Sequence, residues 1–465
     1  MSPPESTTPP TPPTPPTSPA SPSGIRAAFG RGTVIAVVIG TLIGAALVYV
    51  SVQNSLFAGR HNLKISVRIN DLDERVGRDL IVPMTGWVLQ VDLPEDLPQS
   101  VLDTLEITLR EERTGATLDI TDRLIFEGAH GRLVLPESIR LTTGLFSIRV
   151  GLTDENEAEL VEHRRIRIRS WLGGPPIGSR QIIHFDFNVD RDGDGRPDFQ
   201  QDLESFGLAS PDQPELAATV ARQVAERAVA RVLRAYDPKD DPNGTGYTID
   251  TVFVRFLLET ERSPFVTRIC VGGANDAFPD SVGNVRFDPQ NETKGSSECE
   301  PKDDAPAAGI FPREFAVYSQ SALYRDVTEP FDSTRGGTPF GGLAEDTATG
   351  AETARGQAIQ RAIDVLGDAL GTIMAHESAH ALGLVPPGRP GVGLFGGSEK
   401  DGAEYAHNLD TSGKTPETAW LMNVGSEFKF EDLAGLGPAG ELRFRPLNHA
   451  YLKDRVALSA GRYQP

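Results

Sequence analysis

The sequence has very little cysteine: Cys270 and Cys299 are the only two in 465 residues. Two cysteines exclude a disulfide-rich scaffold and a zinc module built from cysteine ligands. Their spacing leaves two interpretations open. Either they form one disulfide, which would contribute about 3 kcal/mol to stability, or they are two buried thiols.

Basic residues are also in deficit, with 45 Lys and Arg against 65 Asp and Glu and a net charge of -20. A protein that binds nucleic acid needs a basic surface for the phosphate backbone. We therefore exclude nucleic acid as a partner. The length exceeds that of one ordinary domain and predicts two folded units with additional segments.

One long uncharged run is present, "TVIAVVIGTLIGAALVYVSV" at residues 33–52. Its length suits a helix that crosses the roughly 30 Å hydrocarbon core of a bilayer. It predicts a transmembrane anchor at 33–52, preceded by a disordered tail at 1–32 that begins with a Pro, Thr and Ser-rich stretch. The basic residues on either side do not fix the orientation. We place the C-terminal part on the extracytoplasmic side, because the chemistry inferred below usually operates there. A cleaved signal peptide, which would give a secreted protein, is the alternative.

Residues 61–171 alternate between apolar and polar side chains, as in "LKISVRI", "WVLQVDL" and "LEITLRE". This period of two, interrupted by turn sequences, predicts an antiparallel β-sandwich of immunoglobulin-like type. No cluster of reactive side chains occurs there. The domain is therefore interpreted as a spacer or a binding module, with the spacer favoured.

An aspartate-rich segment follows within residues 182–204. It places Asp190, Asp192, Asp194 and Asp198 at positions 1, 3, 5 and 9 of a calcium-binding loop, with Gly195 at the turn position. Gln201 stands where an EF-hand has its bidentate glutamate. The segment therefore resembles the short calcium loops of thrombospondin type 3 and dockerin repeats more than an EF-hand. A solvated acidic linker is the alternative.

The period changes to 3.6 in residues 211–458, which we predict to be an α+β domain. "PELAATVARQVAERAVARVLRAY" at 214–236 is typical of a long helix. Two strand-like segments and a second long helix follow. That second helix carries "HESAH", in which His376 and His380 project from one face and can bind a single Zn²⁺. Glu377 lies just off this line, where it can act as general base on a zinc-bound water.

The third metal ligand cannot be read from a fixed spacing. Gly383 ends the helix, and Pro386, which cannot ligate, stands where a third histidine is expected. A Gly/Pro-rich insertion follows, and His407 is the only histidine between His380 and the segment "AWLMNVG". We predict His407 as the third ligand, with Asp410 or Glu404 as alternatives. The remaining histidines carry no metal spacing and are interpreted as structural: His61, His130, His163, His184 and His449.

The "HESAHALGL" segment resembles the metzincin clan of zinc endopeptidases, and "AWLMNVG" resembles the methionine turn of that clan, with Met422 below the metal. The resemblance implies a metzincin-like catalytic domain, Zn²⁺ as cofactor and a protein or peptide substrate. This sequence departs from the clan at Pro386. It also lacks the tyrosine that some members have after the methionine, since Asn423 and Val424 occupy those positions.

The sequence as a whole predicts a membrane-anchored, zinc-dependent endopeptidase with a β-sandwich stalk and a calcium-binding junction. Two alternatives stay open. One is a catalytically inactive envelope adhesion or scaffold protein that keeps a peptidase-like fold. The other is a gluzincin-type peptidase in which Glu404 is the third ligand.

Overall fold

The protein is described here by a computed structural model. The described residues are 63–70, 80–136, 139, 141–169, 181–236, 254–257, 266–289, 299, 308–343, 346, 353–386, 395, 397, 405–408 and 419–455. The chain divides into two compact units, one of Met1–His61 with Glu155–Ala158 and the other of Asn62–Asp154 with Glu159–Pro465. All helices and strands given below belong to the second unit.

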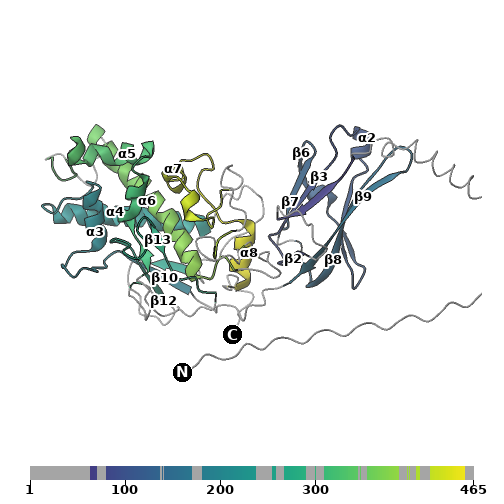
Figure 1. Ribbon diagram of the computed structural model, residues 1–465, viewed down its shortest axis with the longest axis horizontal. Coiled ribbons are helices and arrows are strands. Elements are labelled where there is room, and N and C mark those ends of the chain that lie inside the picture. Colours follow the sequence, from purple (N-terminus) through teal and green to yellow (C-terminus); the bar gives the residue numbers. More distant parts are fainter. Residues whose placement is uncertain are drawn as a thin grey trace, which may run out of the picture. The chain divides into compact units, whose positions relative to one another are not determined.

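Residues 63–169 form two β-sheets (Figure 1). The first has the order β1-β3-β7-β6 and is antiparallel, with strands Ser66–Ile69, Val88–Asp92, His130–Val134 and Ile125–Glu127. The second has the order β2-β9-β8-β4-β5, with strands Leu80–Val82, Glu159–Ile168, Gly144–Thr153, Glu106–Glu111 and Thr117–Asp119. Two short helices, α2 (Gln99–Leu102) and η1 (Thr121–Arg123), complete this part.

One pairing in the second sheet is parallel, that of β2 with β9. The pairings of β9 with β8, β8 with β4 and β4 with β5 in this sheet are antiparallel. The alternating burial along β1 and β3 shows that one face of these strands is covered, as the period of two indicates. Alternation carries no information on strand direction, so the sequence could not distinguish this parallel pair from an antiparallel one.

From residue 181 onward the fold mixes helices with a parallel sheet. The sheet order is β11-β10-β12, formed by Val254–Leu257, Gln181–Asp186 and Val266–Cys270, and both pairings are parallel. A two-stranded antiparallel pair, β13 (Gly283–Asn284) with β14 (Gly309–Ile310), adjoins β12 through a bridge between Val271 and Ile310. The α-helices are α3 Asp198–Ser205, α4 Pro214–Tyr236, α5 Ala322–Thr328, α6 Ala354–Ala381, α7 Phe430–Leu433 and α8 Pro446–Arg455. The 3-10 helices are η2 Pro312–Tyr318, η3 Glu329–Phe331, η4 Ser333–Arg335 and η7 Gly425–Glu427.

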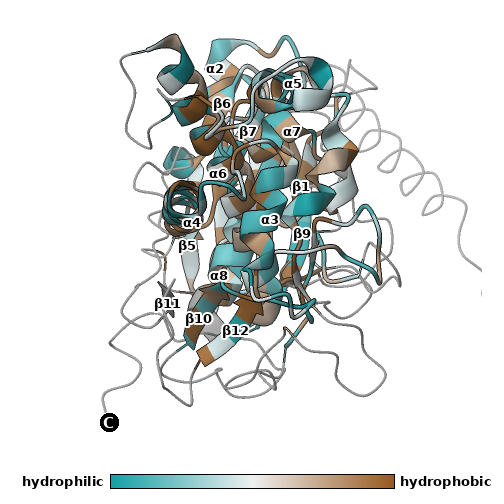
Figure 2. Ribbon diagram, turned by 90° about the vertical axis from the view of Figure 1, so that its left-hand side faces the viewer, coloured by the Kyte–Doolittle hydropathy of each residue, from teal (hydrophilic) through white to brown (hydrophobic). Residues whose placement is uncertain are grey.

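The central strand β10 overlaps the start of the stretch at 182–204, which the sequence analysis interpreted as a calcium loop or an acidic linker. Every residue of this strand is buried, which is typical of a central parallel strand covered on both faces. Such a strand has no alternation to reveal it. Figure 2 shows hydrophobic residues along β10 and β12.

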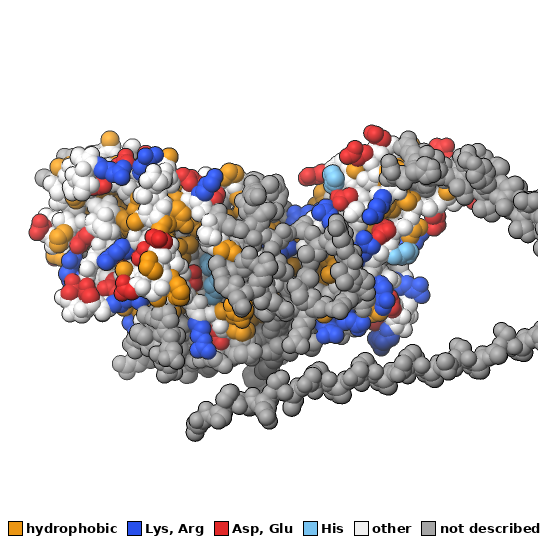
Figure 3. Space-filling model, viewed as in Figure 1, with side chains coloured by type: hydrophobic (Ala, Val, Ile, Leu, Met, Phe, Trp, Pro, Cys, Tyr) orange, Lys and Arg blue, Asp and Glu red, His pale blue; other side chains and the backbone are white. Residues whose placement is uncertain are grey.

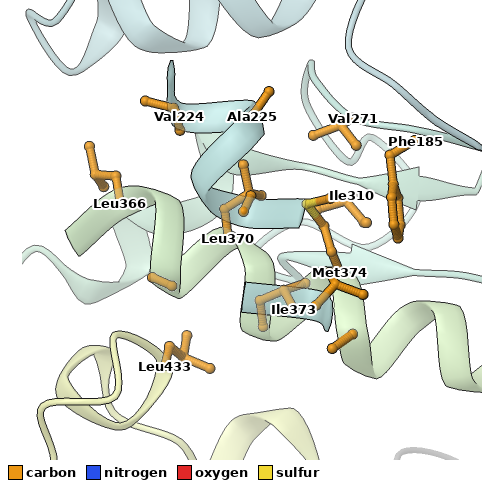
Figure 4. Packing of buried hydrophobic residues seen from close by; sticks show 14 of the residues in the cluster. Phe185, Val224, Ala225, Val271, Ile310, Leu366, Leu370, Ile373, Met374 and Leu433 are labelled. Atoms are coloured by element: carbon orange, nitrogen blue, oxygen red, sulfur yellow. The ribbon is translucent and has the colours of Figure 1, made fainter. Parts of the chain in front are cut away.

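The two long helices α4 and α6 pack against each other at unusually short range. A Cβ at Gly371 would lie 2.4 Å from the carbonyl oxygen of Ala228, and one at Gly367 would lie 2.6 Å from Cγ of Arg227. The i, i+4 spacing of these glycines therefore removes side chains from the crossing. Apolar side chains of both helices meet those of the sheet in one core, in which Leu370 and Met374 are labelled in Figure 4.

The predicted fold class needs correction. In the ranges described above, no helix is long and apolar enough to cross a membrane. The long helices α4 and α6 carry charged residues and place their apolar faces in the internal core. The predicted transmembrane anchor at 33–52 and the tail at 1–32 lie outside the described residues. The predicted fold with a membrane helix is therefore corrected to a mixed α/β fold with several sheets. The membrane-anchored localisation was derived from that helix and is withdrawn with it.

Cys270 and Cys299, which are 29 positions apart in sequence, form a disulfide. The bond decides between the two interpretations that the sequence left open. Cys270 ends β12, and both cysteines cluster with Val189. The disulfide thus ties a long connection to the sheet beside the start of the aspartate-rich loop.

We expect the double variant Cys270→Ala, Cys299→Ala to lose about 3 kcal/mol of unfolding free energy, because the unfolded chain regains the entropy of the open loop. Urea unfolding followed by circular dichroism measures this. The wild-type protein in reductant is the matched comparison and should unfold at a similarly lowered urea concentration. Equal midpoints for the oxidised wild type and the variant would contradict the prediction.

Candidate metal centre

Helix α6 places two of the predicted ligands. It starts at Thr353, whose side-chain oxygen accepts a hydrogen bond of 3.0 Å from the backbone N–H of Gly356, and runs to Ala381. His376 and His380 are one turn apart near its C-terminal end, and both are buried. Because they are separated by four residues, their rings lie on the same face, with centroids 4.7 Å apart.

Gly383 turns the chain directly after this helix. Its φ is +85°, a left-handed conformation that favours glycine. A Cβ there would also lie 2.3 Å from the hydroxyl oxygen of Tyr451. The N–H of Gly383 donates to the carbonyl of His380 at 2.9 Å, which closes the last helical turn. Position 383 therefore excludes other residues by both conformation and space.

His407 reaches the same place from a short segment that is held at both ends. The N–H of Val385 donates to the carbonyl of Ala406 at 3.0 Å, and the N–H of Asn408 donates to the carbonyl of Met422 at 2.9 Å. These bonds fix the backbone on either side of His407. The alternative ligands Glu404 and Asp410 lie outside the described residues.

The three imidazoles converge through their Nε2 atoms. The Nε2 of His376 lies 3.0 Å from that of His380 and 3.2 Å from that of His407. Each Nδ1 meets a backbone carbonyl oxygen instead: Leu421 at 2.6 Å for His376, Leu384 at 2.8 Å for His380 and Tyr405 at 2.7 Å for His407. A carbonyl can only accept, so Nδ1 carries the proton and Nε2 presents a lone pair.

This arrangement fits a metal ion. Three lone pairs at such distances cannot hydrogen-bond to one another, whereas a cation between them would be bound by all three. Nitrogens about 2.0–2.1 Å from a tetrahedral ion are roughly 3.3 Å apart, close to the observed separations. The three histidines thus form a group that could hold a metal ion.

Burial keeps the imidazoles of His376 and His380 neutral, as metal ligands must be. Burial, together with His407, lowers the pKa of His376 to about 3. The pKa of His380 lies well below its ordinary value, mainly because of burial and then because of the other two histidines. Both rings of α6 are therefore uncharged at neutral pH.

Glu377 is buried and lines the same cavity as the three histidines. Its Oε2 accepts a hydrogen bond of 3.0 Å from the backbone N–H of Val285, the residue after β13. Burial raises the pKa of Glu377 to about 8, although this hydrogen bond acts in the opposite direction. A cation bound at the histidines would favour the ionised carboxylate.

Met422 is fully buried and lies in the segment 419–424, which follows His407 in the chain. The neighbouring Leu421 supplies the carbonyl that orients His376, and the carbonyl of Met422 holds Asn408, next to His407. This segment therefore positions two of the three ligands through its backbone. The sequence marked Met422 but gave no sign of these carbonyls, because any residue type can provide them.

The metal centre opens into a cavity of about 830 Å³. Its lining combines apolar side chains, among them Val282, Val285, Phe287, Ile373, Phe428 and Leu433, with polar and charged ones such as Asp280, Asn284 and Arg286. Exposed hydrophobic side chains, among them Val317 and Tyr405, also face it. Figure 3 shows hydrophobic side chains at the surface of this part of the molecule, close to the pale blue of histidine. The Tyr405 ring packs edge-on against Phe287, with centroids 5.4 Å apart.

The structure brings together three of the four predicted calcium ligands in the aspartate-rich loop. Asp190, Asp192 and Asp194 have carboxylate oxygens within 4.8 Å of one another. Asp198 is not part of this group: its carboxylate accepts from the N–H of Arg191 at 3.2 Å and pairs with the Arg191 guanidinium at 3.7 Å. The calcium site stays a prediction, with Asp198 outside its cluster.

The other histidines do not join a metal group in the part of the chain that the structure describes. His130 pairs with Asp92, His163 is exposed on β9, and His184 and His449 are buried. His61 lies outside the described residues.

No family model and no curated protein matches the chain. CopC from Methylosinus trichosporium OB3b is 7% identical and covers 23% of this chain and 93% of its own, with a TM-score of 0.17. PcoC, a methionine-rich copper resistance protein from Escherichia coli, is 9% identical and covers 20% and 88%, with a TM-score of 0.14. The soluble domain of PmoD from Methylocystis sp. ATCC 49242 (Rockwell) is 14% identical and covers 23% and 90%, with a TM-score of 0.15. Similarity at this level supports no assignment for this chain.

We expect His407→Ala to weaken metal binding by at least about 100-fold, since one of three ligands is lost. The measurement is Zn²⁺ affinity by competition with a chromophoric chelator. His163→Ala, which removes an exposed imidazole from β9, is the matched control and should bind as the wild type does. Unchanged affinity in His407→Ala would show that this residue is not a ligand.

Proposed function

We propose that this protein is a zinc-dependent endopeptidase that resembles the metzincin clan. In this proposal His376, His380 and His407 hold the metal and Glu377 is the general base. The observation that carries it is the convergence of three Nε2 atoms beside a buried carboxylate in one cavity.

Bound Zn²⁺ would polarise the substrate carbonyl and lower the pKa of a water molecule towards about 7. The protein's own residues do the rest. The backbone carbonyls of Leu421, Leu384 and Tyr405 keep the imidazoles in the ligating tautomer. The Glu377 carboxylate takes a proton from the attacking water and delivers it to the leaving amine.

A polypeptide suits the cavity better than a small polar metabolite does. The volume of about 830 Å³ can hold several side chains of an extended segment, and its walls offer apolar side chains together with polar ones that suit peptide groups. We propose unfolded or loosely folded protein segments with apolar side chains as substrates.

Two of the sequence-based alternatives make different predictions. An inactive scaffold protein would bind metal without cleaving protein. A gluzincin-type site would depend on Glu404, whereas the geometry supports His407 because its Nε2 already lies 3.2 Å from that of His376. Three imidazoles also suit copper, so Zn²⁺ and Cu²⁺ should be compared in the same binding measurement.

Replacing Glu377 by Gln should lower the cleavage rate by about 10²–10⁴-fold, because the proton acceptor is lost while the ligands remain. Cleavage of labelled unfolded casein by the zinc-loaded protein is the assay, with zinc content measured in parallel. Glu127→Gln makes the same chemical change at an exposed position of β6 and should leave the rate unchanged.

The outcome that contradicts the peptidase proposal is a zinc-loaded wild type that cleaves no unfolded protein or peptide. That result would favour the scaffold interpretation. Loss of zinc in Glu377→Gln would instead show that this residue maintains the site and would leave its role as a base unsupported.

We also propose that the aspartate-rich loop binds Ca²⁺ through Asp190, Asp192 and Asp194. The N–H groups of Gly193 and Gly195 already donate to Asp190 at 2.7 and 2.8 Å, so the loop is folded around this carboxylate. Carboxylate oxygens at alternating positions suit this hard cation.

Addition of millimolar Ca²⁺ should raise the melting temperature of the wild type, because the ion binds only the folded loop. The rise should disappear in Asp192→Asn, Asp194→Asn. Mg²⁺ is the control ion, and a rise of equal size with either ion, or in the variant, would contradict a calcium site here.

A further inference from the structure

Gly283 lies directly against the proposed general base. A Cβ at this position would be 2.2 Å from Oε1 of Glu377, 2.6 Å from its Cδ and 2.7 Å from its Cγ. Real Cβ atoms do not approach other atoms so closely. The carboxylate therefore occupies the volume that any side chain at residue 283 would need.

Backbone conformation does not explain this glycine. Gly283 is not among the residues with positive φ, so other residue types can adopt its backbone conformation. Space is the remaining reason for the absence of a side chain. The same feature would go unnoticed in the sequence, where "SVGNV" contains no motif.

The strand that carries Gly283 is fixed and cannot move away from the carboxylate. Gly283 pairs with Ile310 in the antiparallel β13–β14 ladder. The N–H of Phe311 donates to the carbonyl of Val282 at 2.9 Å, and the Ser281 hydroxyl donates to the carbonyl of Gly283 at 2.8 Å. These bonds hold the strand on both sides of Gly283.

Two contacts thus act on the same carboxylate. The N–H of Val285 donates to Oε2, and the missing side chain at Gly283 leaves free the volume that Oε1, Cδ and Cγ of Glu377 occupy. A buried glutamate has several side-chain rotamers available. The hydrogen bond favours the rotamer in which Oε2 is engaged, and Gly283 leaves room for it.

We propose that Gly283 is a positioning residue for Glu377, acting together with the Val285 N–H. This inference rests on the proposed peptidase function. Residues 283–285 contact neither the reacting atoms nor the metal in this role. They set where the proton acceptor stands, and a misplacement of about 1 Å at a reacting group can cost about 100-fold in rate.

The test is Gly283→Ala in the full-length, zinc-loaded protein, assayed with a fluorogenic peptide taken from a casein cleavage site. We expect kcat to fall about 100-fold, with KM within about threefold of the wild type, because only the carboxylate is displaced. Zinc content and melting temperature should stay close to those of the wild type, because the three histidines are untouched.

Ser333→Thr is the control. It also adds one methyl group, at an exposed position of η4 that is not among the residues lining the cavity. We expect its kcat, KM and zinc content to match the wild type. If Gly283→Ala does not fold, Val285→Pro provides the test, since it removes the N–H donor and should lower kcat at least about tenfold.

The outcomes separate the two proposals. An active wild type whose folded, zinc-loaded Gly283→Ala variant keeps its kcat overturns the positioning role alone. So does a variant that loses zinc in proportion to activity, because its role would then be structural. A zinc-loaded wild type without any peptidase activity overturns the proposed function and this inference with it.

Discussion

Three backbone carbonyls determine what this centre can do. By accepting hydrogen bonds from Nδ1 of His376, His380 and His407, they leave Nε2 of each ring as a lone-pair donor directed at a shared point. Burial then keeps the rings of His376 and His380 neutral. Rotation of one ring by a half turn would break a hydrogen bond and place the Cε1–H group where Nε2 now faces the other nitrogens. The ligating arrangement is thus built into the protein before any ion binds.

Several other parts of the fold hold these histidines and Glu377 in place. Close packing of α4 on α6, permitted by Gly367 and Gly371, fixes the helix that carries two histidines. The 419–424 segment and the 405–408 segment are joined by the Asn408 to Met422 hydrogen bond. Gly283 in strand β13 adjoins Glu377, and Val285, the residue after this strand, donates a hydrogen bond to it. Most of these elements lie far apart in sequence, from β13 at Gly283–Asn284 to the 419–424 segment, so the site exists only in the folded chain.

The sequence allowed a helix with a clear 3.6-residue hydrophobic period to be predicted. It did not show which strands pair with one another. The stretch at 214–236 was predicted as a helix and forms α4 over Pro214–Tyr236. Strand β10 was missed, because a strand buried on both faces shows no alternation. The parallel pairing of β2 with β9 was missed because the sequence pattern carries no direction. The membrane helix inferred from residues 33–52 rested on hydropathy alone, and no helix of the described chain is long and apolar enough to span a membrane.

For the site, the sequence by itself determined which side chains are available and the spacing of those on one helix. The four-residue interval between His376 and His380 sets their shared face, and Gly383 marks the end of the helix that carries them. Only the tertiary structure decided that the His407 Nε2 lies within 3.2 Å of the His376 Nε2, that Leu421 orients His376 and that Gly283 adjoins Glu377. The physical reason is that helix geometry is local, whereas loop placement depends on hydrogen bonds between segments whose distance in sequence says nothing about their distance in space.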